Sequence, residues 1–299
     1  MFASCRVESD SATIAEALTW ARESLTEAEV PNPAVNAERM LEDLLGVSRA
    51  ELYLHRVQSL SEAQRAKLEH WVQERTAGKP LQYLLGHAGF YGLDLVVEEG
   101  VFIPRPETER LVEEVLGKIE NSKLKNEKIN FVDIGTGCGA IAVSIAVCLP
   151  GAQGVATDSS ELALRVAGRN VRRYGVGEQI RFERCDLFPL ESERFDLIVS
   201  NPPYIPTAMI SELSVEVKDF EPYEALDGGP DGLRWIQEII PKAKEHLDLD
   251  GLLALEVGEG QAGRVVSLMQ EAGYESIEVE EDLCGMERVV MGRNLRSEE

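Results

Sequence analysis

The chain has 299 residues, of which 44% are hydrophobic and 28% are charged, a balance typical of a soluble globular protein rather than a disordered or membrane protein. Its formal net charge is -23, from 30 Lys plus Arg against 53 Asp plus Glu, so the molecule as a whole repels a nucleic-acid backbone. Domains commonly span roughly 100 to 200 residues, so this length predicts two.

Five cysteines are scattered along the chain, and none stands at zinc-ligand spacing from another cysteine or from a histidine. We therefore expect free thiols and no metal site. They are Cys5, Cys138, Cys148, Cys185 and Cys284. An odd count without a secretory signal in residues 1–10 indicates a reducing compartment. No window approaches the roughly 20 apolar residues of a membrane span, so we predict a cytoplasmic protein without a membrane partner.

The first segment, residues 1–77, is predicted to be a small helical bundle that recognises the substrate. Three helices begin with capping boxes, in which a hydroxyl residue is followed three positions later by Glu or Gln. The capping residues are Thr13, Ser48 and Ser61. Another helix is predicted to begin with Asn32 as its cap and to end at Gly46. The apolar stripes of these helices predict a core, and the segment contains no catalytic constellation.

The second segment, residues 78–102, mixes apolar and aromatic residues with glycines, which predicts a β-hairpin that connects the domains. In residues 103–299 strands and helices then alternate, which predicts an α/β fold with a mostly parallel sheet covered on both faces. Strands are expected near residues 129–134, 154–158, 180–185, 195–200, 252–257, 277–280 and 288–291. Helices are expected near residues 140–148, 161–174, 233–246 and 261–272. The last two strands are too close for a crossover helix, so the final strand should insert antiparallel.

A glycine-rich turn follows the first strand of this sheet, where Gly135, Gly137 and Gly139 alternate with Thr136 and Cys138. Glycines let a backbone approach a ligand closely and adopt positive φ. The spacing fits the Gly-x-Gly-x-x-Gly turn of dinucleotide sites poorly. An acidic residue at the end of the strand, Asp133, suits a ligand with an ammonium group, such as the methionine part of S-adenosylmethionine.

The ends of the next two strands support the same cofactor. Asp158 ends the second strand, where a carboxylate can accept hydrogen bonds from both ribose hydroxyls. After the third strand, Leu187 and Phe188 are expected to wall the adenine ring, and Asp186 to accept from its exocyclic amine. The sequence therefore predicts an S-adenosylmethionine site.

The segment Asn201, Pro202, Pro203 and Tyr204 follows the fourth strand, at the edge where open α/β sheets bind ligands. Its prolines force an extended, stiff path. An amide nitrogen, or the amine of adenine, is a poor nucleophile because its lone pair is delocalised. We assign Asn201 Oδ1 and the Pro202 carbonyl to accept from the two N–H groups of that nitrogen, and Tyr204 to pack on its flat face. Positioning and electrostatics then carry most of the catalysis.

These motifs resemble the release factor glutamine methyltransferases of the HemK/PrmC type. The resemblance covers nearly everything from Gly78 on. It is carried by residues 78–84, 102–109, 131–139, 201–204, 220–226 and 287–293. It implies a class I S-adenosylmethionine-dependent methyltransferase fold, Rossmann-like and seven-stranded, behind a helical N-terminal domain. It also implies methyl transfer to N5 of the glutamine in the Gly-Gly-Gln loop of peptide chain release factors.

The resemblance also implies roles for the residues of the two motifs. The cofactor would contact Gly135, Thr136, Gly137, Cys138, Gly139, Asp158, Leu187 and Asn201, and the glutamine would contact residues 201–204. Cys138 stands where many relatives carry Thr, and Leu187 where some carry Trp. Residues 104–109 are predicted to begin a helix, and the resemblance implies that they also close over the cofactor.

Two alternatives stay open. An N6-adenine methyltransferase acting on DNA or RNA would use the same Asn-Pro-Pro-Tyr geometry for a flipped adenine, although the acidic charge opposes a direct nucleic-acid partner. A non-catalytic cofactor-binding or interaction module would keep the fold without the chemistry, which the intact Asn201 and Tyr204 oppose.

Overall fold

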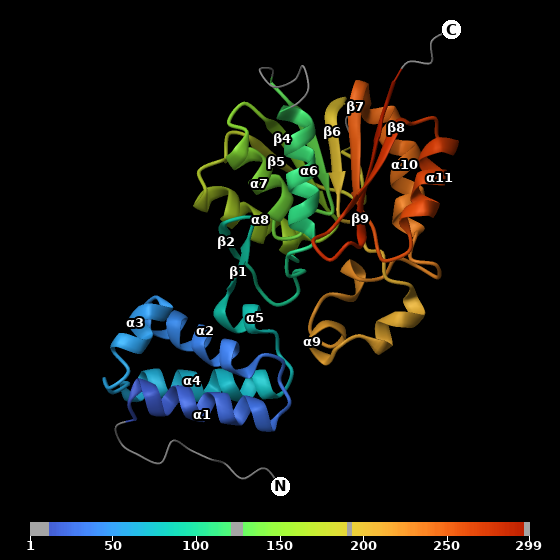
Figure 1. Cartoon of the computed structure of the whole chain (residues 1–299). Coiled ribbons are helices and arrows are strands. Elements are labelled where there is room, and N and C mark those ends of the chain that lie inside the picture. The colour runs from blue at the N-terminus through green and yellow to red at the C-terminus, as the bar shows by residue number, and fades with distance from the viewer. Residues whose placement is uncertain (1–11, 121–127, 190–192, 296–299) are drawn as a thin grey trace. The chain divides into compact units, whose positions relative to one another are not determined.

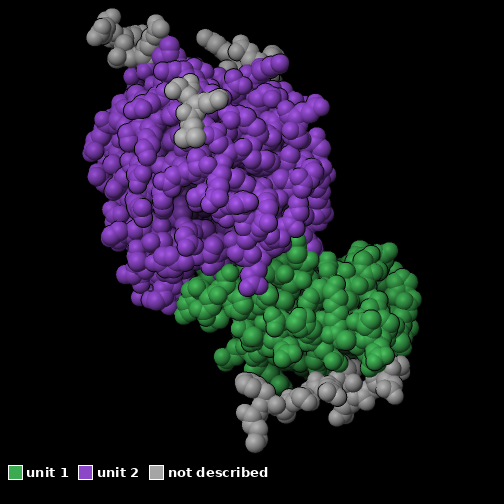
Figure 2. Space-filling model, turned by 180° about the vertical axis from the view of Figure 1, so that it is seen from behind, with its two compact units in different colours: residues 1–86, 215–220 green, residues 87–214, 221–299 purple. Residues whose placement is uncertain are grey.

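The computed structural model describes residues 12–120, 128–189 and 193–295, so residues 1–10 and Cys5 lie outside the described part. The chain forms two compact units (Figure 2). The first comprises Met1–Gly86 and Val215–Phe220, and the second comprises His87–Ser214 and Glu221–Glu299. Because Val215–Phe220 belongs to the first unit, the chain passes between the units after Gly86, before Val215 and after Phe220.

The first unit is helical (Figure 1). Its helices are α1 (Ile14–Glu27), α2 (Pro33–Leu45), α3 (Arg49–Leu54), α4 (Glu62–Thr76), α5 (Leu81–Leu85) and α9 (Val215–Lys218). The capping boxes at Thr13, Ser48 and Ser61 are all confirmed. Each hydroxyl accepts from the backbone N–H three residues later, and the Glu or Gln side chain at that position accepts from the backbone N–H of the capping residue. The apolar faces of α1, α2 and α4 meet in one core that includes Leu25, Met40 and Trp71.

In this unit one local prediction holds only in part and one is wrong. Asn32 stands at the N-cap position of α2, as predicted. The Asn32 side chain makes no cap hydrogen bond, because the residue takes a left-handed conformation (φ 51°) from which its carbonyl accepts from Asn36. Residues 81–85 form a helix rather than part of a hairpin, since Pro80 can start a helix and the leucines of α5 pack against the helical core. The end of α2 at Gly46 (φ 64°) is as predicted.

A buried arginine ties Val215–Phe220 to the helices of the first unit. Arg75 Nε donates to Asn36 Oδ1 (2.8 Å), and its Nη1 donates to the Lys79 carbonyl (3.0 Å). The remaining nitrogen, Nη2, pairs with Glu216 at 2.7 Å. A buried charge requires such partners. Glu216 lies on α9, so its ion pair with Arg75 joins α9 to α4.

The second unit contains a two-stranded antiparallel hairpin and a seven-stranded sheet (Figure 1). The hairpin pairs β1 (His87–Phe90) with β2 (Leu93–Val96), which confirms that part of the prediction. The sheet has the order β5-β4-β3-β6-β7-β9-β8. Its strands are β3 (Asn130–Ile134), β4 (Gln153–Asp158), β5 (Ile180–Arg184), β6 (Phe195–Ser200), β7 (Leu247–Glu256), β8 (Glu275–Glu281) and β9 (Glu287–Arg293). β9 runs antiparallel to both neighbours, as predicted.

Helices cover both faces of this sheet, as predicted (Figure 1). They are α6 (Thr108–Glu120), α7 (Ala140–Cys148), α8 (Glu161–Arg173), α10 (Arg234–His246) and α11 (Ala262–Glu271), with 3₁₀ turns at Thr207–Glu212 and Tyr223–Ala225. The strand order turns back between β3 and β6, so right-handed crossovers place α7 and α8 on one face and α10 on the other. No helix among the described residues is long and apolar enough to span a membrane.

Candidate active site

Four neighbouring strands end at one edge of the sheet. In the register of β4, β3, β6 and β7, a single row contains Thr157, Ile134, Ser200 and Leu255. Parallel strands lie about 4.8 Å apart, so the residues after this row stand side by side. They are Asp158, Gly135, Asn201 and Glu256. The fold therefore brings the glycine turn and residues 201–204 together, where open α/β sheets bind ligands.

The glycine turn joins β3 to α7 in conformations that favour glycine. Gly135 and Gly137 have φ of 69° and 57°, and a Cβ added to either would meet no atom within 4 Å. Thr136 N donates to the Thr157 carbonyl (2.9 Å), and Gly137 N donates to Asp158 Oδ2 (2.9 Å). The backbone of the turn is thus held in place while Gly135 and Gly137 leave open space beside it.

The end of the turn is buried. Gly139 begins α7 with φ 86°, and a Cβ there would lie 3.0 Å from the Cβ of Ala167 on α8. The Cys138 carbonyl accepts from Asn170 Nδ2 (2.8 Å), and burial raises the pKa of the Cys138 thiol to about 12. The thiol is therefore neutral at physiological pH.

Asp133 does not face the open side of the turn, so our expectation that it attracts an ammonium group directly is wrong. Its side chain is fully buried, and Oδ2 accepts from Thr136 Oγ1 (2.6 Å) and Ala142 N (3.1 Å). Burial raises the pKa of Asp133 to about 7. A buried carboxyl group cannot touch a ligand outside, and this one joins the turn to the start of α7 instead.

Asp158 stands at the end of β4 and is only partly buried. Its Oδ1 accepts from Ser160 N (2.8 Å) and its Oδ2 from Gly137 N, while burial raises the pKa of its carboxyl group. Each carboxylate oxygen has two lone pairs, so each can accept one further hydrogen bond from a ligand.

The residues after β5 differ in burial. Leu187 is buried, and its carbonyl accepts from Thr157 Oγ1 (2.8 Å). The Phe188 ring stacks on His246 of α10, with 4.7 Å between the ring centroids. Asp186 is exposed. The His246 ring therefore covers one face of the Phe188 ring.

Residues 201–204 continue directly from β6, whose last residue, Ser200, donates its hydroxyl to the Ile134 carbonyl (2.8 Å). Asn201 is partly buried, and its Nδ2 donates to Thr108 Oγ1 at 2.9 Å. Pro202 is buried and Pro203 is partly buried. The bond between Ser200 and Ile134 therefore links β6 to β3 where the two loops begin.

Tyr204 is held at both ends. Its hydroxyl donates to Glu256 Oε1 (3.3 Å), and its carbonyl accepts from Gln261 Nε2 (2.9 Å). Burial and the neighbouring Glu256 carboxyl group raise the pKa of the Tyr204 hydroxyl well above its usual value. Gly232 lies so close that an added Cβ would stand 2.3 Å from the Tyr204 oxygen. The segment is thus fixed by residues from three other parts of the chain.

Two family models match parts of this chain. The family model of the PrmC N-terminal domain matches residues 16–86, and that of the methyltransferase small domain matches residues 115–215. A release factor glutamine methyltransferase of Geobacter sulfurreducens is 41% identical over 94% of this chain and 96% of its own length. The chain belongs to the release factor glutamine methyltransferase family. A member from Gloeobacter violaceus is 43% identical over 91% of this chain and 95% of its own length.

The fold of this family member also occurs in more distant methyltransferases. A methyltransferase from Pyrococcus furiosus aligns with a TM-score of 0.51 at 17% identity, covering 78% of this chain and 99% of the other. At this identity the likeness shows the class I methyltransferase fold alone.

Three residues that hydrogen-bond to the predicted segment 201–204 were missed from the sequence: Thr108, Glu256 and Gln261. Glu256 ends the apolar run of β7, and a charged residue at the end of a buried strand was a usable signal. Thr108 lies within the stretch 104–109, which was singled out without a role for its hydroxyl. Gln261 carried no signal, because only the fold places it beside Tyr204.

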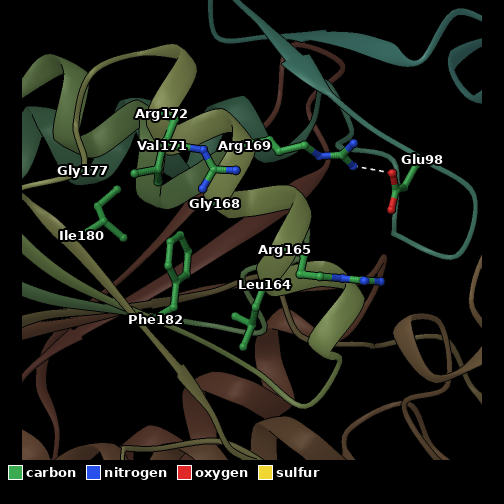
Figure 3. A pocket seen from close by; sticks show the side chains of 10 residues that line it. All are labelled: Glu98, Leu164, Arg165, Gly168, Arg169, Val171, Arg172, Gly177, Ile180 and Phe182. Atoms are coloured by element: carbon green, nitrogen blue, oxygen red, sulfur yellow. Dashed lines mark hydrogen bonds and ion pairs between the residues drawn. The ribbon is translucent and has the colours of Figure 1, made fainter.

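A separate hollow of about 760 Å³ lies between α8 and the edge strand β5 (Figure 3). Arg165, Arg169 and Arg172 of α8 stand around it, and Arg169 pairs with Glu98. None of the residues that line this hollow belongs to the predicted cofactor or substrate site. The hollow is therefore distinct from the sheet edge at Asn201.

Proposed function

We propose that this chain transfers a methyl group from S-adenosylmethionine to the side-chain amide, at N5, of the glutamine in the Gly-Gly-Gln motif of a peptide chain release factor. The observation that carries this proposal is the pairing of Ile134 with Ser200, because Gly135 and Asn201 follow these two residues at the ends of adjacent parallel strands. Membership in the release factor glutamine methyltransferase family supports the substrate class.

The residues at the edge fit the cofactor. The backbone of Gly135 and Gly137 has open space beside it, as a cradle for a closely approaching ligand requires. Asp158 keeps acceptor capacity for ribose hydroxyls. We assign residues 135–139, Asp158, Leu187 and Asn201 to hold the cofactor, which when bound supplies an electrophilic methyl group on a sulfonium.

The chain itself then has to hold and orient the glutamine amide. Asn201 Oδ1 and the Pro202 carbonyl would accept from its two N–H groups, which favours pyramidal nitrogen and turns the lone pair toward the methyl group. Tyr204 would pack on the flat face of the amide, with its ring kept in place by the bond to Glu256. The nitrogen loses one proton in the reaction. That proton passes to water, because amide oxygens are too weakly basic to keep it.

The recognition of the release factor is assigned to the helical first unit, which has a core of its own and matches the PrmC N-terminal domain. We also place the activity in the cytoplasm. The cysteines of the described part of the chain, Cys138, Cys148, Cys185 and Cys284, are free thiols, as a reducing compartment favours.

The test is mass spectrometry of purified release factor after incubation with the wild-type chain and methyl-labelled cofactor. We expect one labelled methyl group on the Gly-Gly-Gln glutamine, and Asn201→Ala should lower kcat by roughly 10²- to 10³-fold, as when a key polar group of an active site is lost. Thermal melting of the variant controls for folding. Equal transfer by both proteins, or label at any other residue, would overturn the assignment.

A parallel reaction with adenine-containing DNA and RNA oligonucleotides tests the alternative substrate, because the same segment suits a flipped adenine. Methyl transfer to adenine but not to the release factor would favour that alternative. We expect the opposite result.

A further inference from the structure

The buried side chain of Asn170, on α8, is hydrogen-bonded to two other parts of the second unit. Its Oδ1 accepts from Val96 N of β2 at 2.7 Å, and its Nδ2 donates to the Val96 carbonyl at 3.0 Å. The same Nδ2 donates to the Cys138 carbonyl of the glycine turn at 2.8 Å. Asn170 is 0% exposed, and both of its N–H groups are used, since a side-chain amide has two. It therefore joins α8 to the hairpin and to the glycine turn.

These partners determine which residue type fits at this position. The oxygen of the Asn170 amide meets an N–H group and its nitrogen meets two carbonyls, so only one orientation of the amide satisfies all three. An ionised aspartate has nearly the same shape but only accepts, so it would face the Val96 and Cys138 carbonyls without a donor. An apolar residue would lose all three bonds. The position is thus specific for asparagine.

The bond to Cys138 replaces one that α7 does not supply. In an α-helix a backbone N–H bonds to the carbonyl four residues earlier, so the N–H of Ala142 would serve the Cys138 carbonyl. Here Ala142 N donates to Asp133 Oδ2 at 3.1 Å instead. Cys138 is buried, and a carbonyl buried away from water needs a partner. Asn170 supplies that partner from another helix.

The peptide bond between Cys138 and Gly139 is therefore held on both sides. Its carbonyl accepts from Asn170, and its N–H, that of Gly139, donates to the Thr136 carbonyl at 2.8 Å. Ala167, which precedes Asn170 on α8, would lie 3.0 Å from a Cβ added at Gly139, so α8 also packs closely against this peptide. Without the bond from Asn170, the peptide can rotate and change the path of the turn before it.

We propose that Asn170 is a positioning residue which, by holding the Cys138 carbonyl, keeps the glycine turn in the conformation that binds S-adenosylmethionine. The inference rests on the proposed function, in which residues 135–139 hold the cofactor. Asn170 acts through the backbone of the turn and does not touch the cofactor itself.

A matched control lies one turn later on the same helix. The Tyr174 hydroxyl accepts from Asp94 N of β2 at 2.6 Å and donates to the Asp94 carbonyl at 3.0 Å, which is the same kind of pair that Asn170 makes with Val96. A hydroxyl has one proton, so Tyr174 has no second donor for the turn. Tyr174→Phe therefore loosens the contact between α8 and the hairpin and leaves the bond to Cys138 in place.

The test measures the Kd of S-adenosylmethionine by calorimetry for the wild type, Asn170→Ala, Asn170→Asp and Tyr174→Phe. Kd should rise about 5- to 100-fold in both Asn170 variants, the range expected when a buried carbonyl loses its partner. Tyr174→Phe should bind the cofactor as the wild type does. Urea unfolding should show lower stability in all three variants, so a change of Kd confined to Asn170 is not an effect of stability.

The turnover rate gives a second readout. With purified release factor and saturating cofactor, kcat of the Asn170 variants should stay close to that of the wild type, because Asn201 and Tyr204 keep their own partners. An unchanged Kd in Asn170→Ala, an equal rise of Kd in Tyr174→Phe, or a fall of kcat as large as the loss of binding would overturn the inference. The Kd measurements need no release factor, so they test the inference separately from the proposed function, which fails if the methyl group goes to a residue other than glutamine.

A readout on the wild type does not depend on how the variants fold. The side-chain ¹⁵N–¹H resonances of Asn170 should shift when S-adenosylmethionine is titrated, because the cofactor binds against the turn whose carbonyl accepts from them. The control is Asn36 in the first unit, whose Nδ2 also donates to two backbone carbonyls, those of Pro31 and Asn32, at 3.0 and 3.1 Å. Its resonances should stay constant. Asn170 resonances that do not respond to bound cofactor would refute the positioning role.

Discussion

Two loops leave the same edge of the sheet from adjacent strands, yet they are stabilised in different ways. The glycine turn after β3 is fixed by its neighbours in sequence and on β4, through Asp133, Thr157 and Asp158. The segment 201–204 after β6 is fixed by side chains from distant parts of the chain, Thr108, Glu256 and Gln261. A loop that binds with its backbone can be specified locally, whereas a loop that orients a side-chain amide needs buried polar partners from elsewhere.

Tightly packed glycines occur at both loops, Gly232 beside Tyr204 and Gly139 within the glycine turn, and substitutions at these two positions separate the loops most sharply. In Gly232→Ala, the added Cβ would stand 2.3 Å from the Tyr204 carbonyl oxygen, and φ is 76°. We expect the segment 201–204 to shift and kcat to fall about 100-fold, the effect of a misplacement of about 1 Å, while the calorimetric Kd of the cofactor stays the same. A control is Gly117→Ala, in a helix with nothing within 4 Å. Weaker cofactor binding together with a normal kcat in Gly232→Ala would contradict the separation of the two loops.

The converse change is Gly139→Ala in the glycine turn. The left-handed φ of 86° costs an L-residue about 1 to 2 kcal/mol, and the new Cβ would also press on Ala167. We expect lower stability in urea unfolding and weaker cofactor binding. The kcat at saturating cofactor should change much less than in Gly232→Ala. Equal losses of kcat in the two variants would show that a shift of the glycine turn also shifts the segment 201–204.

The smallest expected effect is that of Gln261→Ala, which removes the donor to the Tyr204 carbonyl and the acceptor for Gly258 N. A hydrogen bond of this kind contributes about 0.5 to 1.5 kcal/mol, so kcat should fall by up to about 10-fold. Steady-state kinetics would measure it, with Gln237→Ala on the exposed side of α10 as the control. A loss as large as that of Gly232→Ala would mean that Gln261 touches the substrate itself.

Features that depend on residues close together in the sequence were predicted correctly, and features that depend on packing were not. Most strands and helices of the second unit were predicted to within two residues, because their apolar periodicity and glycine-containing ends are local signals. The three capping boxes were found for the same reason. The exceptions among the strands and helices are β7, which begins at Leu247 rather than near residue 252, and α6, of which only a helix start at residues 104–109 was predicted. The errors at Asn32 and at residues 81–85 occurred where backbone conformation and packing against the helical core outweighed the local signal.

Asp133 shows the limit of such reasoning within the site. Its position before a glycine turn indicated an acidic group for a ligand, and nothing in the order of residues distinguishes a carboxylate facing outward from one folded under the turn. The bonds from Thr136 and Ala142 decide the matter, because they occupy the carboxyl group inside the protein.

The sequence alone was sufficient for the sheet, the glycine turn, the stiff segment after β6 and the family resemblance, because each depends on residues close together in the chain. Only the tertiary structure placed Asn201 beside Thr108 and Tyr204 beside Glu256, since these hydrogen bonds span 93 and 52 positions. The physical reason is that the register of parallel strands, which no local pattern encodes, determines which strand ends become neighbours.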